Sequence, residues 1–418
     1  MKAAGAAGIA GLAGCAGNGG EQEATTTEQG GDATTTTGEQ ARTLKMGMLM
    51  AVTGDLGTYG AHIRQGAELP VNQINDADVP FTVDTQFEDT ATDPNQGISG
   101  AEAMVNAGYP MIVGALSSGV TIQVAKNVLS QSGIVGTSPS STSPVLTGLQ
   151  DNDFLFRTVP HDALQGAVMA QIVAERFEAM SASTLYVNND YGQGLSEAFT
   201  KSFESDYGGT VHTQVATAKE QSSYTSKLQT ALEGQPEALV MITYPASGTQ
   251  MFKDFYSDFD SDAQILVSDG LKDPQLPSKV GAELSNVRGT APIAEGPGTD
   301  YFNSQYESAF GAQPQIYDGQ AYDAAAVMLL ANAAAGENDG AAIRDNMRAV
   351  ANPEGTVVTP EQLPEGLEMV ANGEDIDFRG ASSAVDFDDA GDMKAVTYDY
   401  FEFTSDGLET VEKIQFKK

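Results

Sequence analysis

Two loops rich in hydroxyl side chains occur where the chain could bind an anion. Ser117-Ser118-Gly119 follows the apolar run 111–116, and residues 138–144 (SPSSTSP) follow the apolar run 134–137. Hydroxyl groups and free backbone N–H groups at the start of a helix can hold a carboxylate. The same residue types also serve as ordinary helix N-caps. Two such loops after consecutive strands favour a carboxylate site over capping alone.

Three tyrosines and one aspartate stand in further polar loops after apolar runs: Tyr59, Tyr191, Tyr244 and Asp269. Tyrosine offers a flat apolar wall with a polar tip. The negative charge of Asp269 could pair with an ammonium group. Each of these residues alone could be a turn residue. Together with the hydroxyl loops they predict a site for a small molecule that carries both a carboxylate and an ammonium.

The sequence offers little support for catalysis or for a metal site. Cys15 is the only cysteine, which excludes an internal disulfide and a cysteine-based zinc site. Residues 115–119 resemble a nucleophile elbow without its first glycine, but no histidine stands in a motif with a supporting acid. Residues 258–269 imitate a calcium loop, yet Ala263 occupies the position that needs glycine. We therefore expect no enzyme activity, no cofactor and no metal; an amidohydrolase acting on short amides is the alternative from another class.

Strand and helix signals alternate from Leu44 onward. Strands are predicted at 44–52, 81–87, 111–116, 134–137, 184–188, 211–216, 238–243 and 265–268, and helices at 61–74, 164–177 and 223–232. This alternation predicts an α/β protein with parallel sheets covered by helices on both faces. Ligands bind such sheets at the carboxyl ends of the strands, where the loops above are placed. Pro70 lies inside the first predicted helix and should kink or break it.

Composition limits the classes of partner. The 418 residues allow two domains, and 57 acidic against 21 basic residues give a formal net charge of −36. Nucleic acid is excluded as a partner, because binding it requires clustered lysine and arginine. The scattered acids and rare lysines indicate a surface adapted to high salt, where self-repulsion is screened. An ordinary acidic secreted protein is the alternative.

The N-terminal segment indicates export and lipid attachment. A lysine and a short Ala/Gly-rich run end in Leu12-Ala13-Gly14-Cys15, which resembles a secretory signal with a lipobox over residues 1–15. The run is too short to span a bilayer, which takes about 20 apolar residues. Residues 16–43 contain no aliphatic side chain larger than alanine, so they are predicted to form a disordered, threonine-rich stalk. A disordered tail with an accidental cysteine is the alternative.

The order and spacing of several motifs resemble the substrate-binding proteins of branched-chain amino acid ABC transporters, which have the type I periplasmic-binding fold. The motifs are residues 53–60 (TGDLGTYG), 88–94 (EDTATDP), 138–144 (SPSSTSP), 156–158 (FRT), 165–166 (QG) and 190–194 (DYGQG). The resemblance runs from about Leu44 to the C-terminus. It implies two α/β lobes joined by a three-strand hinge, with the ligand held in the cleft between them.

The resemblance also assigns roles to individual residues. It implies that Ser118 and Thr142 hold the ligand carboxylate and that the backbone of Ser140 accepts from the ammonium. Asp269 matches the acid that neutralises the ammonium, where leucine-binding members usually carry glutamate. The side chains that match the pocket lining are Tyr59, Tyr191 and Tyr244. Because Asp269 is shorter than glutamate by one methylene, urea, short amides and aromatic carboxylates remain alternative ligands.

The expected lobes each combine two stretches of the chain. Lobe one is predicted to hold 44–160 and 291–380, and lobe two 161–288 and 381–418. The chain is expected to cross between them near 159–161, 288–292 and 380–385. We expect a monomer on the extracellular face of a haloarchaeal membrane, anchored through lipid on Cys15. It is expected to deliver its ligand to an ABC permease.

Overall fold

The computed structural model describes residues 41–352, 354–404 and 407–417. The predicted signal segment, Cys15 and the stalk up to residue 40 lie outside the described residues. Arg42 and Thr43, which were predicted to end the stalk, instead begin the first strand, β1 (Arg42–Met50). The Arg42 guanidinium donates to the Asn332 side chain at 2.5 Å and to the Asn332 carbonyl oxygen at 2.9 Å, which ties the start of this strand to a helix.

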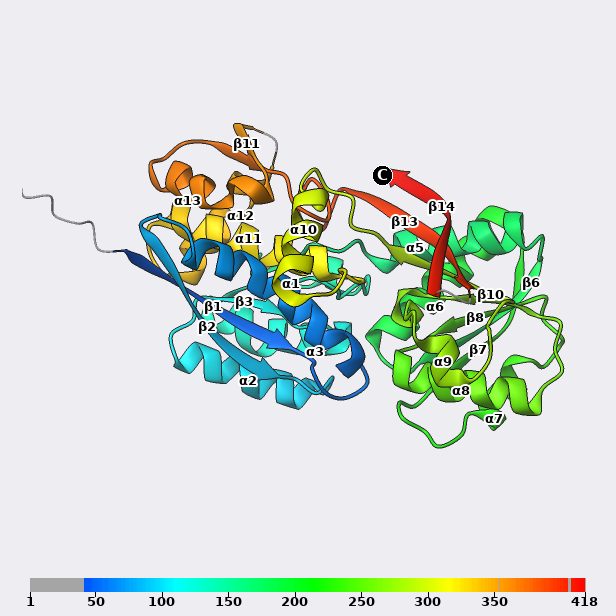
Figure 1. Ribbon diagram of the computed structural model, residues 1–418. Helices are drawn as coiled ribbons and strands as arrows, with labels where there is room; N and C mark the ends of the chain where they lie inside the picture. The colour runs from blue at the N-terminus through cyan, green and yellow to red at the C-terminus, as the bar shows by residue number, and fades with distance from the viewer. Residues whose placement is uncertain (1–40, 353, 405–406, 418) are drawn as a thin grey trace, which may run out of the picture. The chain divides into compact units, whose positions relative to one another are not determined.

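The first sheet has five strands in the order β2-β1-β3-β4-β5, and every neighbouring pair is parallel. Its other strands are β2 (Phe81–Asp89), β3 (Met111–Gly114), β4 (Val135–Ser138) and β5 (Leu155–Arg157). Figure 1 shows α1 (Gly57–Asn75) and α2 (Pro94–Asn106) on opposite faces of this sheet. Because both faces are covered, β3 and β4 are buried along their whole length.

The second sheet has seven strands in the order β14-β13-β10-β9-β8-β6-β7. Five of them run parallel: β6 (Ser181–Val187), β7 (Thr210–Thr217), β8 (Ala238–Ile242), β9 (Gln264–Val267) and β10 (Val287–Pro292). The C-terminal strands β13 (Ala395–Thr404) and β14 (Gly407–Lys417) join antiparallel as a hairpin. The predicted parallel sheet therefore carries an antiparallel edge.

Helices cover the second sheet and complete the first. The helices of the second sheet include α5 (Asp162–Gln171), α6 (Asp190–Tyr207), α7 (Thr225–Ala231) and α8 (Pro245–Asp258). On the first sheet, α3 (Ser118–Val124) contacts α2, while α10 (Thr299–Phe310) and α11 (Asp318–Ala335) contact α1. Further helices, α12 (Gly340–Ala351) and α13 (Leu363–Ala371), pack on α11 beside a small parallel pair, β11 (Thr356–Val358) and β12 (Ile376–Phe378). Within the described residues, no helix combines the length and apolarity that crossing a bilayer requires.

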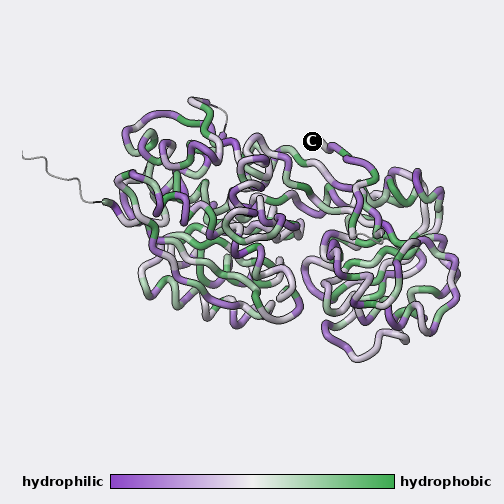
Figure 2. The backbone as a smooth tube through the Cα atoms, viewed as in Figure 1, coloured by the Kyte–Doolittle hydropathy of each residue, from purple (hydrophilic) through white to green (hydrophobic). Residues whose placement is uncertain are grey.

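The hydropathy pattern follows this architecture. Green segments concentrate in the interior of Figure 2, where the sheets lie, and much of the outer chain is purple or pale. The helix α11 is buried over nearly all of its length, consistent with its run of alanines. Of the predicted kink or break at Pro70, the break does not occur, because α1 continues through this residue to Asn75.

Three segments connect elements of the first sheet with elements of the second. They link β5 to α5, β10 to α10 and β12 to β13. The proposed lobe division placed residues 291–292 in lobe one, but the structure pairs Ala291 with Asp399 in the seven-stranded sheet. It placed residues 381–393 in lobe two, whereas Phe387 packs on Phe156 of β5 with ring centroids 5.2 Å apart. Residues 291–292 therefore belong with the second sheet, and residues 381–393 with the first.

Candidate ligand-binding site

The polar loops lie at the carboxyl ends of the strands of both sheets. Ser118 follows β3 and begins α3, and Ser140 follows β4. From the second sheet, Tyr191 follows β6, Tyr244 follows β8, and Asp269 follows β9. Each parallel sheet directs its own loops to one edge, and contacts between the two sheets' loops bring the two edges together.

A small cavity forms between these loops. Six of the seven residues predicted to bind ligand line it: Tyr59, Ser118, Ser140, Tyr191, Tyr244 and Asp269. Its volume is about 20 Å³, which is room for about one water molecule. An amino-acid-sized molecule therefore enters only when the loops or their side chains move apart.

Thr142 is placed differently from the prediction. It is buried but does not line the cavity. Its carbonyl oxygen accepts a hydrogen bond from the Asp162 backbone N–H at 2.7 Å, and its hydroxyl faces the Asp162 carboxyl. The loop 138–144 thus presents Ser140 to the cavity, while Thr142 lies beside Asp162 at the start of α5.

Asp269 is the acidic side chain that lines the cavity. It is 4% exposed, and its two carboxylate oxygens accept hydrogen bonds from the Tyr317 hydroxyl at 2.5 Å and the Tyr191 hydroxyl at 3.0 Å. Burial raises the pKa of Asp269, and the bonds from the two tyrosines oppose that rise. A cationic group in the cavity would favour the ionised form further, because an opposite charge nearby stabilises a buried carboxylate.

Asp162 is a second buried carboxyl group beside the site. It is fully buried, and burial together with the charge of Asp269 raises its pKa well above the usual range. The Thr142 hydroxyl and Arg157 act in the opposite direction. Two carboxyls this close disfavour being ionised together, so the pair attracts a proton or a positive group.

Tyrosine rings form the walls of the cavity. Tyr191 and Tyr244 stack with centroids 5.5 Å apart and planes 10° from parallel. The Tyr244 hydroxyl accepts from the Asn189 amide at 3.0 Å, and the Tyr59 hydroxyl donates to the Gly270 carbonyl oxygen at 3.2 Å. Burial raises the pKa values of all three tyrosines, so they remain neutral hydrogen-bonding walls at ordinary pH.

Sequence reasoning missed Tyr317, along with the apolar lining residues Leu56, Ile63 and Leu116. Tyr317 precedes a helix rather than following a strand. A search for polar residues in loops after strands therefore could not find it. Its backbone is in the left-handed region at φ 70°, a conformation that costs a bulky residue on the order of 1–3 kcal/mol. The surrounding packing holds it there, and its hydroxyl reaches Asp269 as a result.

Further contacts join loops of the first sheet to loops of the second around the cavity. The Ser143 hydroxyl donates to the Asp190 carbonyl oxygen at 2.9 Å, and the Lys219 ammonium to the Thr92 carbonyl oxygen at 2.9 Å. The Ser247 hydroxyl donates to the Asp55 carboxylate at 3.3 Å. The site is thus in a closed conformation.

The sequence matches the family model described as periplasmic binding protein over residues 43–363, well over half of the chain. The chain belongs to the periplasmic binding protein family. Members of this family are solute-binding proteins.

Individual relatives support the same family. The Leu/Ile/Val-binding protein homolog 1 of Brucella abortus is 30% identical over 312 residues, which cover 70% of this chain and 79% of the relative. The chemotactic signal transduction system substrate-binding protein BasB of Halobacterium salinarum is 28% identical over 376 residues, 87% of each chain. The crystal structure of the leucine binding protein LivK of Thermotoga maritima has a TM-score of 0.74 at 21% identity, and covers 89% of this chain and 98% of that one. This likeness shows that the fold is the type I periplasmic-binding fold.

Proposed function

We propose that this protein is the extracellular solute-binding component of an ABC importer and that it binds a branched-chain or related amino acid. The observation that carries the proposal is that Asp269 from one sheet lines the same cavity as Ser118 and Ser140 from the other. A zwitterion placed between them has a partner for each charge, which matters because an unpaired buried charge is costly. The Brucella relative is named for leucine, isoleucine and valine, which supports this ligand class.

Each group has a defined task in the proposal. The hydroxyl of Ser118 takes the carboxylate, with Thr142 behind it. The Ser140 hydroxyl donates to the Leu116 carbonyl oxygen at 3.0 Å, so Ser140 contributes its backbone as an acceptor for the ammonium. Asp269 pairs with the ammonium; burial and the charge of Asp269 favour the protonated form of Asp162, so Asp269 supplies the negative charge. The apolar side chain of the ligand lies against tyrosine rings and Leu56, Ile63 and Leu116. Because the ligand contacts loops of both sheets, binding favours the closed form over the open one.

A screen by titration calorimetry in molar KCl tests this function. Leucine, isoleucine and valine are compared with acetamide, urea and benzoate. We expect at least one of the amino acids to bind with Kd of about 1 µM or lower. Binding of benzoate without any amino acid, or of an amide or urea that persists after Gln320→Leu, would replace the proposal by the corresponding alternative ligand. Conversion of an amide during the titration, followed by mass spectrometry, would establish the hydrolase alternative.

In this proposal the protein is a monomer that is held at the outer face of the membrane by lipid on Cys15. It delivers the ligand to the transmembrane permease of the importer. The likeness to the chemotactic BasB protein over 87% of the chain favours a chemotaxis transducer as a second candidate partner. Crosslinking in native membranes, with and without the bound amino acid, distinguishes the two by the protein captured in the loaded state. Release of a Cys15→Ser variant into the medium tests the anchor.

A further inference from the structure

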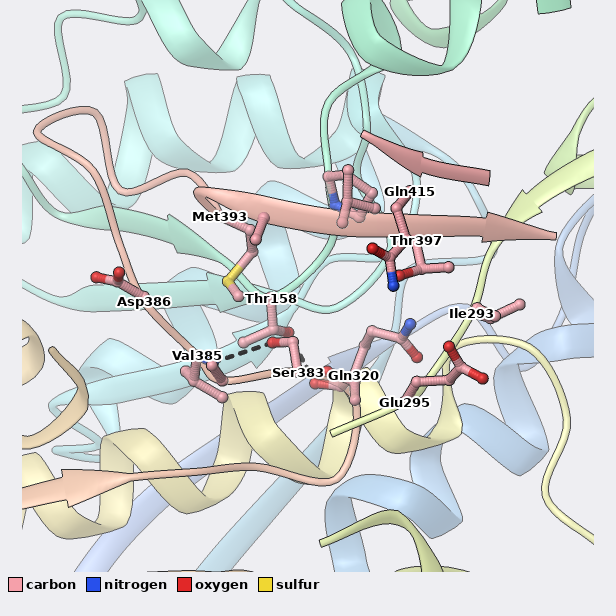
Figure 3. Close-up of a pocket in the computed structure, with 15 residues that line it drawn as sticks. Thr158, Ile293, Glu295, Gln320, Ser383, Val385, Asp386, Met393, Thr397 and Gln415 are labelled. Atoms are coloured by element: carbon pink, nitrogen blue, oxygen red, sulfur yellow. Dashed lines mark hydrogen bonds between the residues drawn. The ribbon is translucent and has the colours of Figure 1, made fainter. Parts of the chain in front are cut away.

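A second and larger cavity lies where the three connecting segments between the two sheets meet. Its volume is about 220 Å³, and each segment contributes to its lining, with Thr158 from the first, Ile293 from the second and Ser383 from the third (Figure 3). We call it the hinge cavity. It is separate from the ligand-binding site, since the two cavities share no lining residue.

A buried amide belongs to this cavity. Gln320 on α11 is 3% exposed, and its side-chain oxygen has no hydrogen-bond partner among the described residues. Figure 3 shows the side chain directed into the cavity toward Thr397 of β13. Buried polar groups are nearly always paired, and leaving one unpaired is costly. Because that oxygen is itself shielded, a molecule in the cavity reaches it once the terminal amide rotates, and a hydrogen-bond donor there would then remove this cost.

The charges around the hinge cavity disfavour an anion. Two carboxylates line it, Glu295 and Asp386. Each forms an ion pair, Glu295 with Lys413 and Asp386 with Lys394, the latter at 2.7 Å. The paired carboxylates leave little net attraction for a cation and would repel a free carboxylate. A neutral molecule fits this environment best.

The remaining walls and the size limit the ligand further. Ile293, Val385 and Met393 provide an apolar lining. The volume of about 220 Å³ is below the roughly 300–1,000 Å³ of pockets for drug-sized molecules. The glutamine amide carries an acceptor and a donor side by side, and a primary carboxamide or urea group pairs with both at once.

We propose that the hinge cavity binds a small neutral molecule with a carboxamide or urea group on a short aliphatic body, and that its occupancy changes the affinity of the ligand-binding site. The helix α11 connects the two sites. Tyr317, just before this helix, bonds to Asp269, and the Gln320 carbonyl oxygen accepts from the Thr158 hydroxyl at 2.7 Å. A molecule held by Gln320 contacts the segments that must bend when the lobes separate. The coupling, though not the binding itself, rests on the proposed function.

Titration calorimetry with isovaleramide in molar KCl tests the site. The wild-type protein is compared with Gln320→Leu, which removes the amide, and with Ala395→Leu, which fills the cavity from its exposed side without removing a buried group. Gln313→Leu is the matched control, because Gln313 is exposed and does not line the cavity. We expect both cavity variants to weaken amide binding at least tenfold and the control to leave it unchanged.

A second titration separates this site from the ligand-binding site. We expect isovaleramide to bind protein that is already saturated with the amino acid. It should change the affinity for the amino acid by the same factor by which the amino acid changes the affinity for isovaleramide. Equal amide binding by wild type and both cavity variants, or simple competition with the amino acid, would overturn the proposal. If no amino acid binds, the proposed function fails, and the variant titration still decides the hinge cavity by itself.

Discussion

At the scale of single residues, the charge of Asp269 should determine whether the protein prefers an amino acid or a neutral ligand. Asp269→Asn keeps the shape of the side chain and removes its charge. Truncating one partner of a buried charge pair costs about 2–5 kcal/mol, so we expect the affinity for an amino acid to fall by at least about a hundredfold. Des-amino analogues carry no ammonium and should lose much less. Calorimetry on both ligand classes measures the difference, and equal losses would argue for a neutral amide ligand.

Asp55 should give ligand binding a pH dependence. It is 2% exposed in the closed site, and burial raises its pKa to about 6, with smaller effects from Lys219, Glu220 and Ser247. In an open form the carboxyl regains water and its pKa falls toward about 4. The closed form therefore binds more protons between pH 4 and 6, so closure and ligand affinity weaken as the pH rises through that window and level off above it.

A matched variant isolates this contribution. Asp55→Asn removes the titrating group and keeps an acceptor for the Ser247 hydroxyl. We expect the affinity of the wild-type protein to fall by up to about tenfold from pH 5 to pH 7, and that of the variant to fall less. The comparison is made by calorimetry at constant salt. Identical pH profiles would assign the dependence to Asp162 and Asp269 instead.

At the scale of elements, α11 holds the third connecting segment through Asp323. This fully buried carboxylate accepts hydrogen bonds from the Ala381 and Ser382 backbone N–H groups at 2.6 and 2.7 Å and from the Ser382 hydroxyl at 2.5 Å. Burial raises its pKa to about 7, and these bonds oppose the rise. Helix and segment therefore form one unit at the hinge cavity.

Removing this acceptor should destabilise the fold. Asp323→Ala leaves three buried donors unpaired, and we expect the free energy of unfolding to fall by about 2–4 kcal/mol. Ser382→Ala removes one donor and keeps the acceptor, so its loss should be about 1 kcal/mol. Urea denaturation of both variants measures the two values. Equal losses would show that the backbone bonds contribute nothing beyond the hydroxyl.

At the scale of the whole molecule, the net charge of −36 opposes the compact state. The Debye length shrinks from about 30 Å at 0.01 M salt to about 3 Å at 1 M, so we expect the melting temperature to rise continuously from dilute buffer to molar KCl. Sucrose, which stabilises proteins without screening charge, is the control. A flat or falling curve in KCl would indicate an ordinary acidic protein.

The sequence by itself determined the architecture and most of the candidate site. Alternating strand and helix signals depend on local hydrophobic periodicity, which is readable along the chain. The parallel arrangement sends the strand-end loops of each sheet to one edge, which groups Ser118 with Ser140 and groups Tyr191, Tyr244 and Asp269. The resemblance to a two-lobed family then predicted that the two groups face each other. The helix through Pro70 was misjudged, because tertiary packing can offset the loss of one backbone hydrogen bond.

The tertiary structure alone decided which groups meet at long range. The Tyr317 hydroxyl reaches Asp269, although the two residues belong to elements of different sheets. Asp162 and Asp269 share a buried environment, and residues of three separate connecting segments line the hinge cavity together with Gln320. Burial and charge proximity depend on neighbours that sequence periodicity does not specify. For that reason the pattern could place residues on strands and loops, but only the folded chain fixed their partners.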